Sequence, residues 1–349
     1  MPLHHPDRSG KKGVSFAMST ERAPQEPTRG MPPSMRPRFS LVVPIFNEEE
    51  VLPTTYARVK RVMENTGERF EVIFVDDGSR DGSRQLLDEL SHNDRQVRAL
   101  HFSRNFGHQT AITAGLDYAR GEAIIVLDGD LQDPPELIPD MIERWREGFD
   151  VVYAKRTARQ GESLFKRWSA ALFYRLLRFL TDVDIPMDTG DFRLIDRKVS
   201  DTLKTLTERS RFIRGLVAWT GFRQTAVEYV REPRLMGQPK YSLGKMLRLG
   251  VDAITAFSDK PLRLALYVGS GLALISLLGL VVLLVVAATT ASTASPAWIL
   301  SLALAFINSV ALLTLGILGQ YVARIHDEVR HRPLYILDPS PTDGDDDHA

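Results

Sequence analysis

Two long uncharged runs near the C-terminal end constrain this chain more than any other feature of its 349 residues. The first extends from Leu262 to about residue 288 and carries no charge after Arg263, and the second extends from Pro296 to about residue 321. Each exceeds the roughly 20 residues that a helix needs to cross a bilayer. A buried helix of a soluble protein would not remain apolar on every face over such a length. The sequence therefore predicts a C-terminal pair of transmembrane α-helices within residues 261–323.

The charges around this pair predict how it sits in the membrane. Basic residues lie on the two sides that face away from the short uncharged connection 289–295: Lys245, Arg248, Lys260, Arg324, Arg330 and Arg332. Because segments rich in Lys and Arg stay in the cytoplasm, we expect a multi-pass protein of the cell inner (cytoplasmic) membrane with both termini cytoplasmic. Residues 241–260 are expected to form an amphipathic juxtamembrane helix, and residues 324–349 a cytoplasmic C-terminal tail.

Apolar, β-branched runs alternate with amphipathic stretches in residues 38–240, after a Pro-, Arg- and Ser-rich segment 1–37 that is expected to be a disordered tail. Strands are expected at residues 39–44, 70–75, 97–102, 123–127 and 151–154, with helices between them. This alternation predicts an α/β domain with a doubly wound, mostly parallel sheet. An apolar stripe from Phe165 to Phe179, flanked by Lys and Arg, favours a helix lying on the membrane surface over an ordinary core-facing helix.

Acidic residues collect at the ends of three of these strands: Glu48, the pair Asp76 and Asp77, and the pair Asp128 and Asp130. The carboxyl ends of parallel strands share the edge at which α/β sheets bind ligands. Paired carboxylates there suit a hard divalent cation that keeps open positions for phosphate oxygens. An isolated Asp-Gly-Asp can equally be a solvated turn, so the two interpretations stay open at this point.

Several classes of protein are disfavoured by what the sequence lacks. It contains no cysteine, which excludes a disulfide framework, a thiolate metal site and a thiol nucleophile. Its formal net charge is zero, so no global field argues for nucleic acid as a partner. Neither the Walker glycine-lysine loop nor the Gly-x-Gly-x-x-Gly fingerprint is present, which argues against ATPases and dehydrogenases.

Motifs at the strand ends resemble those of a known family. Residues 43–48, 75–79 and 128–130 resemble the signature of inverting family 2 glycosyltransferases with the GT-A fold. Residues 102–107, 131–135, 188–194 and 239–242 are similar to the polyprenyl-phosphate members, such as bactoprenol glucosyltransferases, dolichol-phosphate mannose synthase and the aminoarabinose transferase of lipid A modification. The resemblance runs from about Phe39 to Leu337 and implies a Rossmann-like GT-A catalytic domain followed by the two membrane helices.

The resemblance also implies roles for single residues. The nucleotide-sugar donor would be bound by residues at the strand ends and by nearby cations: Pro44, Phe46, Glu48, Asp76, Asp77, Asp128, Gly129, Asp130, Lys155, Arg156 and Lys240. Mg²⁺ or Mn²⁺ on the diphosphate would be bound by Asp128, Asp130 and Gln132. Asp191 and Asp130 would be catalytic, with Asp191 as general base or acceptor-orienting group. Lys240 and Arg156 can also be read as solvated charges, and His108 is assigned no role.

The activity that the resemblance implies is inverting transfer of one sugar, with UDP-glucose as first choice, to undecaprenyl or another polyprenyl phosphate at the cytoplasmic membrane face. The product would be a polyprenyl-phosphate sugar for cell-envelope glycosylation. Other donors are alternatives: GDP-mannose, UDP-N-acetylhexosamine, UDP-galactose or an aminoarabinose nucleotide. A processive polysaccharide synthase and a non-catalytic membrane scaffold are less favoured, because the Gln-x-x-Arg-Trp motif is missing and the metal carboxylates are intact. Small residues in the apolar runs, such as Gly269 and Gly316, would permit close helix packing and a homo-oligomer.

Overall fold

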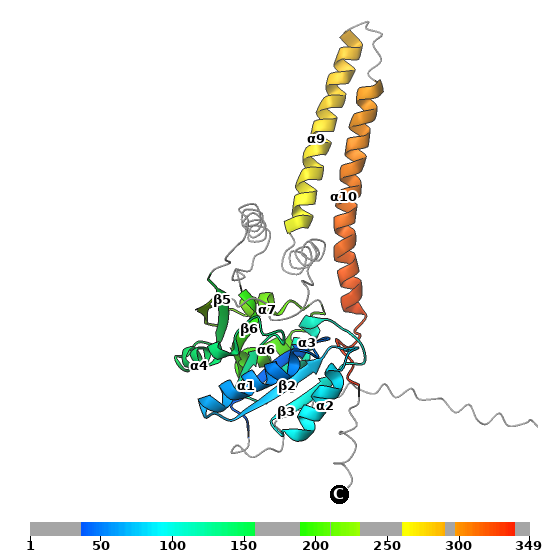
Figure 1. The fold of residues 1–349 in the computed structure, drawn as a ribbon. Helices are drawn as coiled ribbons and strands as arrows, with labels where there is room; N and C mark the ends of the chain where they lie inside the picture. Colours follow the sequence, from blue (N-terminus) through cyan, green and yellow to red (C-terminus); the bar gives the residue numbers. More distant parts are fainter. Residues whose placement is uncertain (1–35, 158–188, 210, 231–259, 290–296, 339–349) are drawn as a thin grey trace, which may run out of the picture.

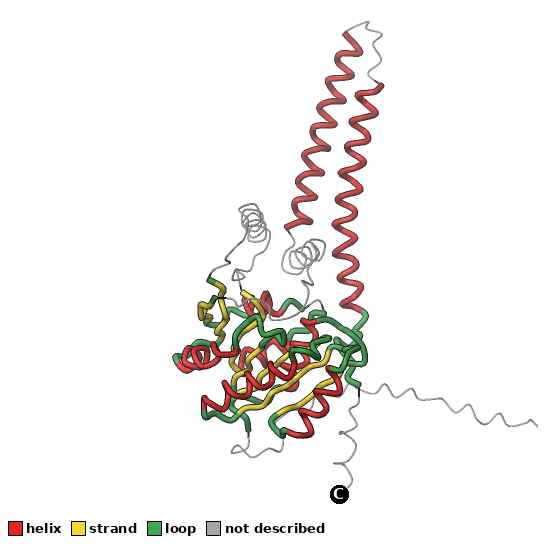
Figure 2. Tube along the Cα trace, in the orientation of Figure 1, coloured by secondary structure: helices red, strands yellow, loops and turns green. Residues whose placement is uncertain are grey.

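The structure is a computed structural model that describes residues 36–157, 189–209, 211–230, 260–289 and 297–338. They form an α/β domain and two long helices that extend away from it (Figures 1 and 2). Four predicted features lie wholly or almost wholly outside these residues: the N-terminal tail, the surface helix 165–179, the juxtamembrane helix 241–260 and Lys240.

A mixed, mostly parallel sheet of seven strands, ordered β3-β2-β1-β4-β6-β5-β7, is the centre of the domain. The strands are β1 (Phe39–Ile45), β2 (Phe70–Asp76), β3 (Val97–His101), β4 (Ala123–Val126), β5 (Val151–Arg156), β6 (Thr189–Asp196) and β7 (Gln224–Tyr229). Strand β6 is antiparallel to both its neighbours, and the other pairings are parallel. The prediction of a mostly parallel sheet is therefore confirmed.

Helices cover both faces of the sheet (Figure 1). They are α1 (Leu52–Thr66), α2 (Ser83–Asn93), α3 (His108–Tyr118), α4 (Ile138–Arg146), α6 (Arg197–Thr205) and α7 (Ile213–Trp219). Because side chains alternate across a strand, Phe39 and Leu41 of β1 enter the core that contains α1 and α4, whereas Val42 enters the opposite core with α3. Both cores are apolar and fully buried at these positions, which fixes the register of β1.

Strands β6 and β7 and helices α6 and α7 are not among the elements predicted from the sequence. In β6 the buried positions include Asp191 and Arg193, so the strand shows no apolar run that would reveal it. Helix α3 begins at His108, directly after Gly107, which adopts φ +104° and turns the chain into the helix.

The long helices α9 (Lys260–Thr289) and α10 (Ala297–Val329) lie side by side (Figure 1). Within α10, the 24 residues Phe306–Val329 are long and apolar enough to cross a membrane, with a mean hydropathy of 1.6. In α9, the described residues contain a shorter apolar stretch, Ala265–Gly279. Side chains such as Leu266 and Leu312 are 66% and 68% exposed, which is costly in water but expected against lipid. The second transmembrane span stays a prediction.

The predicted end of the membrane pair, residue 323, lies inside α10, which continues to Val329. The residues after this helix return to the domain and reach its β3 edge (Figure 1). A Cβ atom added at Gly269, Gly271, Gly316 or Gly319 would meet nothing within 4 Å. No described residue outside their own helix therefore packs closely against these glycines, and the predicted oligomer stays a prediction.

Candidate active site

The Asp-Gly-Asp turn after β4 is held in one conformation by its neighbours. A Cβ at Gly129 would lie 2.6 Å from Ile45 Cδ1, so glycine allows the turn to pack against β1. The Thr55 hydroxyl of α1 donates to the Gly129 carbonyl at 2.8 Å. Leu131 has φ +55° and is buried, a backbone conformation that costs of order 1–3 kcal/mol for a non-glycine residue. This stored strain fits a turn whose side chains must be held in place.

Asp128 meets two residues from distant parts of the chain at this edge. The Nε2 atom of His108, at the start of α3, lies 3.4 Å from Asp128 Oδ1 and 3.1 Å from Asp191 Oδ2. One ligand atom from each of these three residues lies within 4.8 Å of the other two. Strand β6 brings Asp191 here because it runs antiparallel to β4, so its first residues lie at the edge where β4 ends. The sequence analysis predicts no role for His108, because no motif in the neighbouring residues points to one.

The Asp191 carboxylate is surrounded by donors. It accepts from Gln109 Nε2 at 3.0 Å as well as from His108, and Arg214 Nε of α7 lies 3.3 Å from its Oδ1. Buried Arg193 donates to the backbone carbonyls of Gly190 and Asp191, which fixes the start of β6. Gln109, Arg193 and Arg214 were also given no role from the sequence. Arg193 lies within the motif 188–194, whereas Gln109 and Arg214 belong to none of the motifs.

The charges in this cluster shift its pKa values in opposite directions. Burial raises the pKa of Asp128 to about 6, with help from the negative charges of Asp191, Asp133 and Asp130 and against the pull of His108. Burial also acts to raise the pKa of Asp191, but the His108 hydrogen bond and the charge of Arg214 outweigh it and hold that pKa well below its usual range. Burial lowers the pKa of His108, yet the two carboxylates raise it to about 9. His108 therefore stays protonated beside the two carboxylates near neutral pH.

The cluster has the properties of a divalent cation site. The Oδ1 atoms of Asp128 and Asp191 are buried and accept no hydrogen bond from the residues that the structure describes. His108 Nε2 lies 3.4 Å from the first and Arg214 Nε 3.3 Å from the second, as ion pairs without a hydrogen bond. A hard cation would satisfy these oxygens. The other predicted ligands, Asp130 and Gln132, follow in the same turn, where the Asp130 carboxylate accepts the Gln132 N–H at 3.2 Å. Their role in metal binding stays a prediction.

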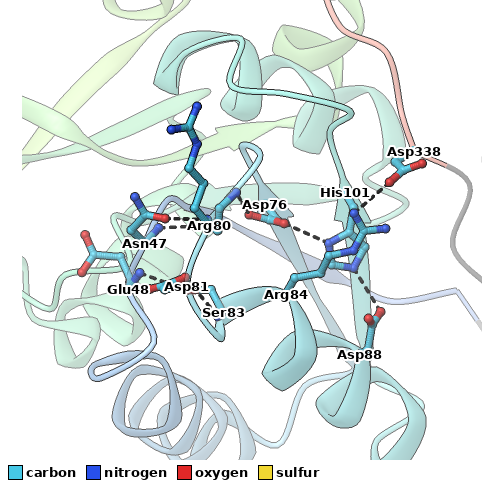
Figure 3. Close-up of polar contacts among 11 residues, drawn as sticks. Asn47, Glu48, Asp76, Arg80, Asp81, Ser83, Arg84, Asp88, His101 and Asp338 are labelled. Atoms are coloured by element: carbon cyan, nitrogen blue, oxygen red, sulfur yellow. Dashed lines mark hydrogen bonds and ion pairs between the residues drawn. The ribbon is translucent and has the colours of Figure 1, made fainter.

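The acidic pair at the end of β2, Asp76 and Asp77, accepts hydrogen bonds from protein groups instead. Buried Asp76 accepts from Ser79 N at 2.9 Å and lies 3.1 Å from His101 Nδ1 (Figure 3). Burial acts to raise the pKa of Asp76, but the hydrogen bonds from His101 and Ser79 lower it overall. Buried Asp77 accepts from Phe106 N at 2.6 Å and Gly107 N at 3.0 Å. The structure thus places both predicted nucleotide-binding carboxylates at the same edge, where they shape the adjoining loop.

The loop after β1 is joined to the loop after β2 through backbone and side-chain contacts (Figure 3). Asn47 has φ +53°, its N–H donates to Ser79 Oγ at 3.0 Å and its Oδ1 accepts from Arg80 N at 2.8 Å. The Glu48 N–H donates to Ser83 Oγ at 3.0 Å. Pro44 is buried under this junction and Phe46 is partly buried. The four predicted donor-binding positions from Pro44 to Asp76 therefore belong to one continuous rim.

The predicted cations of β5 face different surroundings. Lys155 Nζ pairs with Glu228 at 3.2 Å, with both side chains about half exposed. Arg156 is partly buried: its Nε donates to the Tyr229 hydroxyl at 3.0 Å, its Nη2 lies 3.6 Å from Asp133, and Tyr229 also donates to Asp133. A Cβ at Gly190, beside Asp191, would lie 3.0 Å from Arg156 Nη2. Arg156 therefore lies next to the start of β6, beside Asp191, whereas Lys155 is more exposed.

Comparison with known proteins agrees with this geometry. The family model described as glycosyl transferase family 2 matches residues 40–204. The chain is 54% identical over 306 residues to an uncharacterized glycosyltransferase, YkcC, of Bacillus subtilis, covering 87% of this chain and 94% of that protein. The chain belongs to glycosyltransferase family 2. It is an enzyme of that class.

Two further likenesses complete the comparison. The family 2 chain is 39% identical over 300 residues to the bactoprenol glucosyl transferase of Shigella phage SfV, covering 86% of this chain and 98% of that one. Among solved structures, glucosyl-3-phosphoglycerate synthase from Mycobacterium tuberculosis aligns at 16% identity with a TM-score of 0.44, covering 67% of this chain and 80% of that one. The second likeness is distant and bears on no residue of the site.

Proposed function

We propose that this family 2 enzyme transfers one sugar from a nucleotide-sugar, UDP-glucose as first choice, to a polyprenyl phosphate at the cytoplasmic face of the membrane. The observation that carries the proposal is the cluster of Asp128, Asp191 and His108 at the sheet edge, in a chain that also has an exposed apolar helix. The likeness to a bactoprenol glucosyl transferase over 86% of the chain supports a lipid phosphate as acceptor.

A divalent ion, Mg²⁺ or Mn²⁺, would be held by Asp128 together with Asp191 or Asp130, beside the protonated His108, and would neutralise the charge on the donor diphosphate. The buried Oδ1 atoms of Asp128 and Asp191, which accept no hydrogen bond from the described residues, support this role. Arg156 would add a second positive charge for phosphate, because its guanidinium lies beside Gly190 at the same edge. The rim formed by Pro44, Phe46 and Glu48, next to Asp76 and Asp77, would bind the nucleoside.

Transfer with inversion forms one bond, from an acceptor phosphate oxygen to the anomeric carbon, and breaks the bond from that carbon to the donor diphosphate. A phosphate monoester has a second pKa of about 6, so the acceptor is largely dianionic at neutral pH and has no proton to lose. Asp191 is already engaged by His108, Gln109 and Arg214. We therefore assign Asp191 an orienting role, through the cations it holds, rather than proton abstraction.

The membrane helices would keep the site beside its lipid substrate. We propose that both α9 and α10 span the bilayer, with the domain and both termini in the cytoplasm, since the basic residues Lys260, Arg263, Arg324, Arg330 and Arg332 flank the apolar stretches. The predicted surface helix 165–179 would then lie near the lipid phosphate.

A direct assay tests the proposal. Purified full-length enzyme in lipid nanodiscs receives undecaprenyl phosphate, Mg²⁺ and one radiolabelled donor at a time: UDP-glucose, UDP-N-acetylglucosamine, UDP-galactose or GDP-mannose. We expect a lipid that carries a single sugar, formed with UDP-glucose and abolished by EDTA. A polymer would instead indicate a processive synthase, and no product with any donor would defeat the proposal.

A further inference from the structure

The residues that follow α10 form a short segment on the edge of the sheet. We call residues 333–338 the C-terminal strap. Its Ile336 carbonyl accepts from Ser103 N at 3.0 Å, and its Asp338 N–H donates to the His101 carbonyl at 2.8 Å. Leu337 forms an antiparallel bridge with Phe102. The strap therefore covers the outer edge directly after β3, the strand at one end of the sheet.

Side chains from both flanking helices fix the strap. The Tyr335 ring stacks on Phe102 at 5.2 Å with an interplanar angle of 15°. Its hydroxyl donates to Asp117 of α3 at 3.0 Å. On the other side, Asp338 pairs with Arg84 of α2 at 2.8 Å (Figure 3). Contacts of this number and variety show that the strap has one defined position.

Phe102 connects the strap to the loop of residues 103–107. Its ring also meets Phe106 edge-to-face at 5.5 Å. The N–H groups of Phe106 and Gly107 donate to the Asp77 carboxylate. The loop also lies directly on the end of β2, since a Cβ at Gly78 would be 2.5 Å from the Arg104 backbone. Tyr335, Phe102 and Phe106 thus form a continuous row of aromatic contacts. At its end, the Phe106 N–H group donates to the Asp77 carboxylate.

A second connection runs through His101. The strap binds its carbonyl oxygen, and its buried imidazole lies between Asp76 Oδ2 and Asp88 Oδ1, at 3.1 Å from each (Figure 3). Asp76 is therefore held by a residue that the strap contacts directly, whereas Asp77 is held by Phe106 and Gly107, which the strap reaches through Phe102. The loop then continues into His108, which meets Asp128 and Asp191.

We propose that the C-terminal strap positions the loop 103–107 and the end of β2 for binding of the nucleotide donor, with Tyr335 as its positioning residue. The inference rests on the proposed function, because it takes the ligand at this edge to be a nucleotide. It ties the membrane to the donor site, since only residues 330–332 separate α10 from the strap. Tyr335 acts through Phe102 and Phe106 and touches no reacting atom.

The test compares substitutions within the strap of the full-length enzyme in nanodiscs. Tyr335→Ala removes both the stack and the hydrogen bond, and Tyr335→Phe removes only the hydrogen bond to Asp117. Ile336→Ala is the matched control, because this side chain is 53% exposed and its backbone bond is kept. We measure binding of UDP and of GDP with Mg²⁺ by calorimetry, KM for the donor and for the lipid acceptor, and hydrogen exchange at the Phe106 and Gly107 amides.

We expect Tyr335→Ala to weaken UDP binding and raise the donor KM about tenfold, a modest loss for a displaced binding group. Exchange at Phe106 and Gly107 should accelerate, the acceptor KM should stay within twofold, and Ile336→Ala should match wild type. Unchanged UDP binding with only a lower melting temperature would overturn the inference. If Tyr335→Ala does not fold, Tyr335→Phe and Asp338→Asn decide in the same way. Failure of the wild type to bind either nucleotide would contradict the proposed function instead, and the exchange rates would still decide whether the strap holds the loop.

Discussion

Two pairs of acidic residues, Asp76 with Asp77 and Asp128 with Asp191, lie at the same edge of the sheet but have different surroundings. Asp76 and Asp77 are buried and bound by protein donors: Ser79, His101, Phe106 and Gly107. Asp128 and Asp191 are also shielded, yet each keeps a buried oxygen that accepts no hydrogen bond from the described residues. The first pair stabilises a loop, whereas the second pair can still bind the divalent ion that we propose to accompany the donor. Residue type and position at a strand end are thus shared, and the partners decide the role.

The largest effect is expected at the second pair. Asp128→Asn should reduce kcat by about 1000-fold, the scale of losing a transition-state electrostatic contact, because an amide cannot hold the divalent ion. The melting temperature without metal should stay the same or rise, since burial already disfavours the Asp128 charge. Product formation and thermal melting in EDTA check both expectations. A large drop in stability would show that Asp128 is structural like Asp77, and would remove the contrast.

The next effect concerns the role of Asp191. Asp191→Ala should lower kcat by about 100-fold because it releases His108 and Arg214 from their positions. The loss should persist from pH 7 to pH 9, above the acceptor's second pKa of about 6. Initial rates across that pH range, with saturating donor, measure it. Recovery to near the wild-type rate at high pH would mean that Asp191 acts as a base.

The pH dependence of metal binding separates the pairs further. Only the deprotonated form of Asp128 binds a cation, and burial raises its pKa to about 6. Affinity for Mg²⁺ should therefore be constant from pH 7 to pH 8 and fall about tenfold per pH unit below pH 6. Calorimetric titration of the donor-free enzyme with MgCl₂ at several pH values tests this. A flat profile down to pH 5 would remove Asp128 from the ligands.

At the first pair we expect a loss of stability rather than of chemistry. Asp77→Ala leaves the Phe106 and Gly107 N–H groups without their acceptor, which costs about 1–3 kcal/mol in free energy of unfolding. The donor KM should rise because the loop loosens, while kcat should change less than threefold. Denaturant unfolding and steady-state kinetics provide the two readouts. A kcat loss as large as that of Asp128→Asn would contradict the division of roles.

The smallest effect is expected at Lys155. Its ion pair with Glu228 is half exposed, and such pairs contribute about 0–1 kcal/mol. Lys155→Met should therefore leave the donor KM within twofold, whereas Arg156→Met should raise it severalfold. A severalfold rise in donor KM for both substitutions would show that both side chains reach phosphate, as the family resemblance implied.

Parts of the molecule could be predicted because their signals are local. Strands β1, β2 and β4 are short apolar runs that stop at acidic turns, and α10 is recognisable from length and hydropathy. Strand β6 was missed because buried Asp191 and Arg193 interrupt its apolar pattern. His108 was missed because its partners are 20 and 83 positions away, so that only folding shows the cluster. The position of the strap is harder still to predict from the sequence, because its contacts join distant residues: Arg84 and Asp338 are 254 positions apart.

Strand β6 has a consequence of its own through its reversed direction. Strand β5 leaves the sheet at the catalytic edge at Arg156, and β6 enters at that edge at Thr189, where Lys155 pairs with Thr189. The two points at which residues 158–188 join the described domain therefore lie next to each other, at the edge that carries Asp128 and Asp191. Any change of sequence between Arg156 and Thr189 meets the sheet at this edge, with both of its ends fixed by the same ladder.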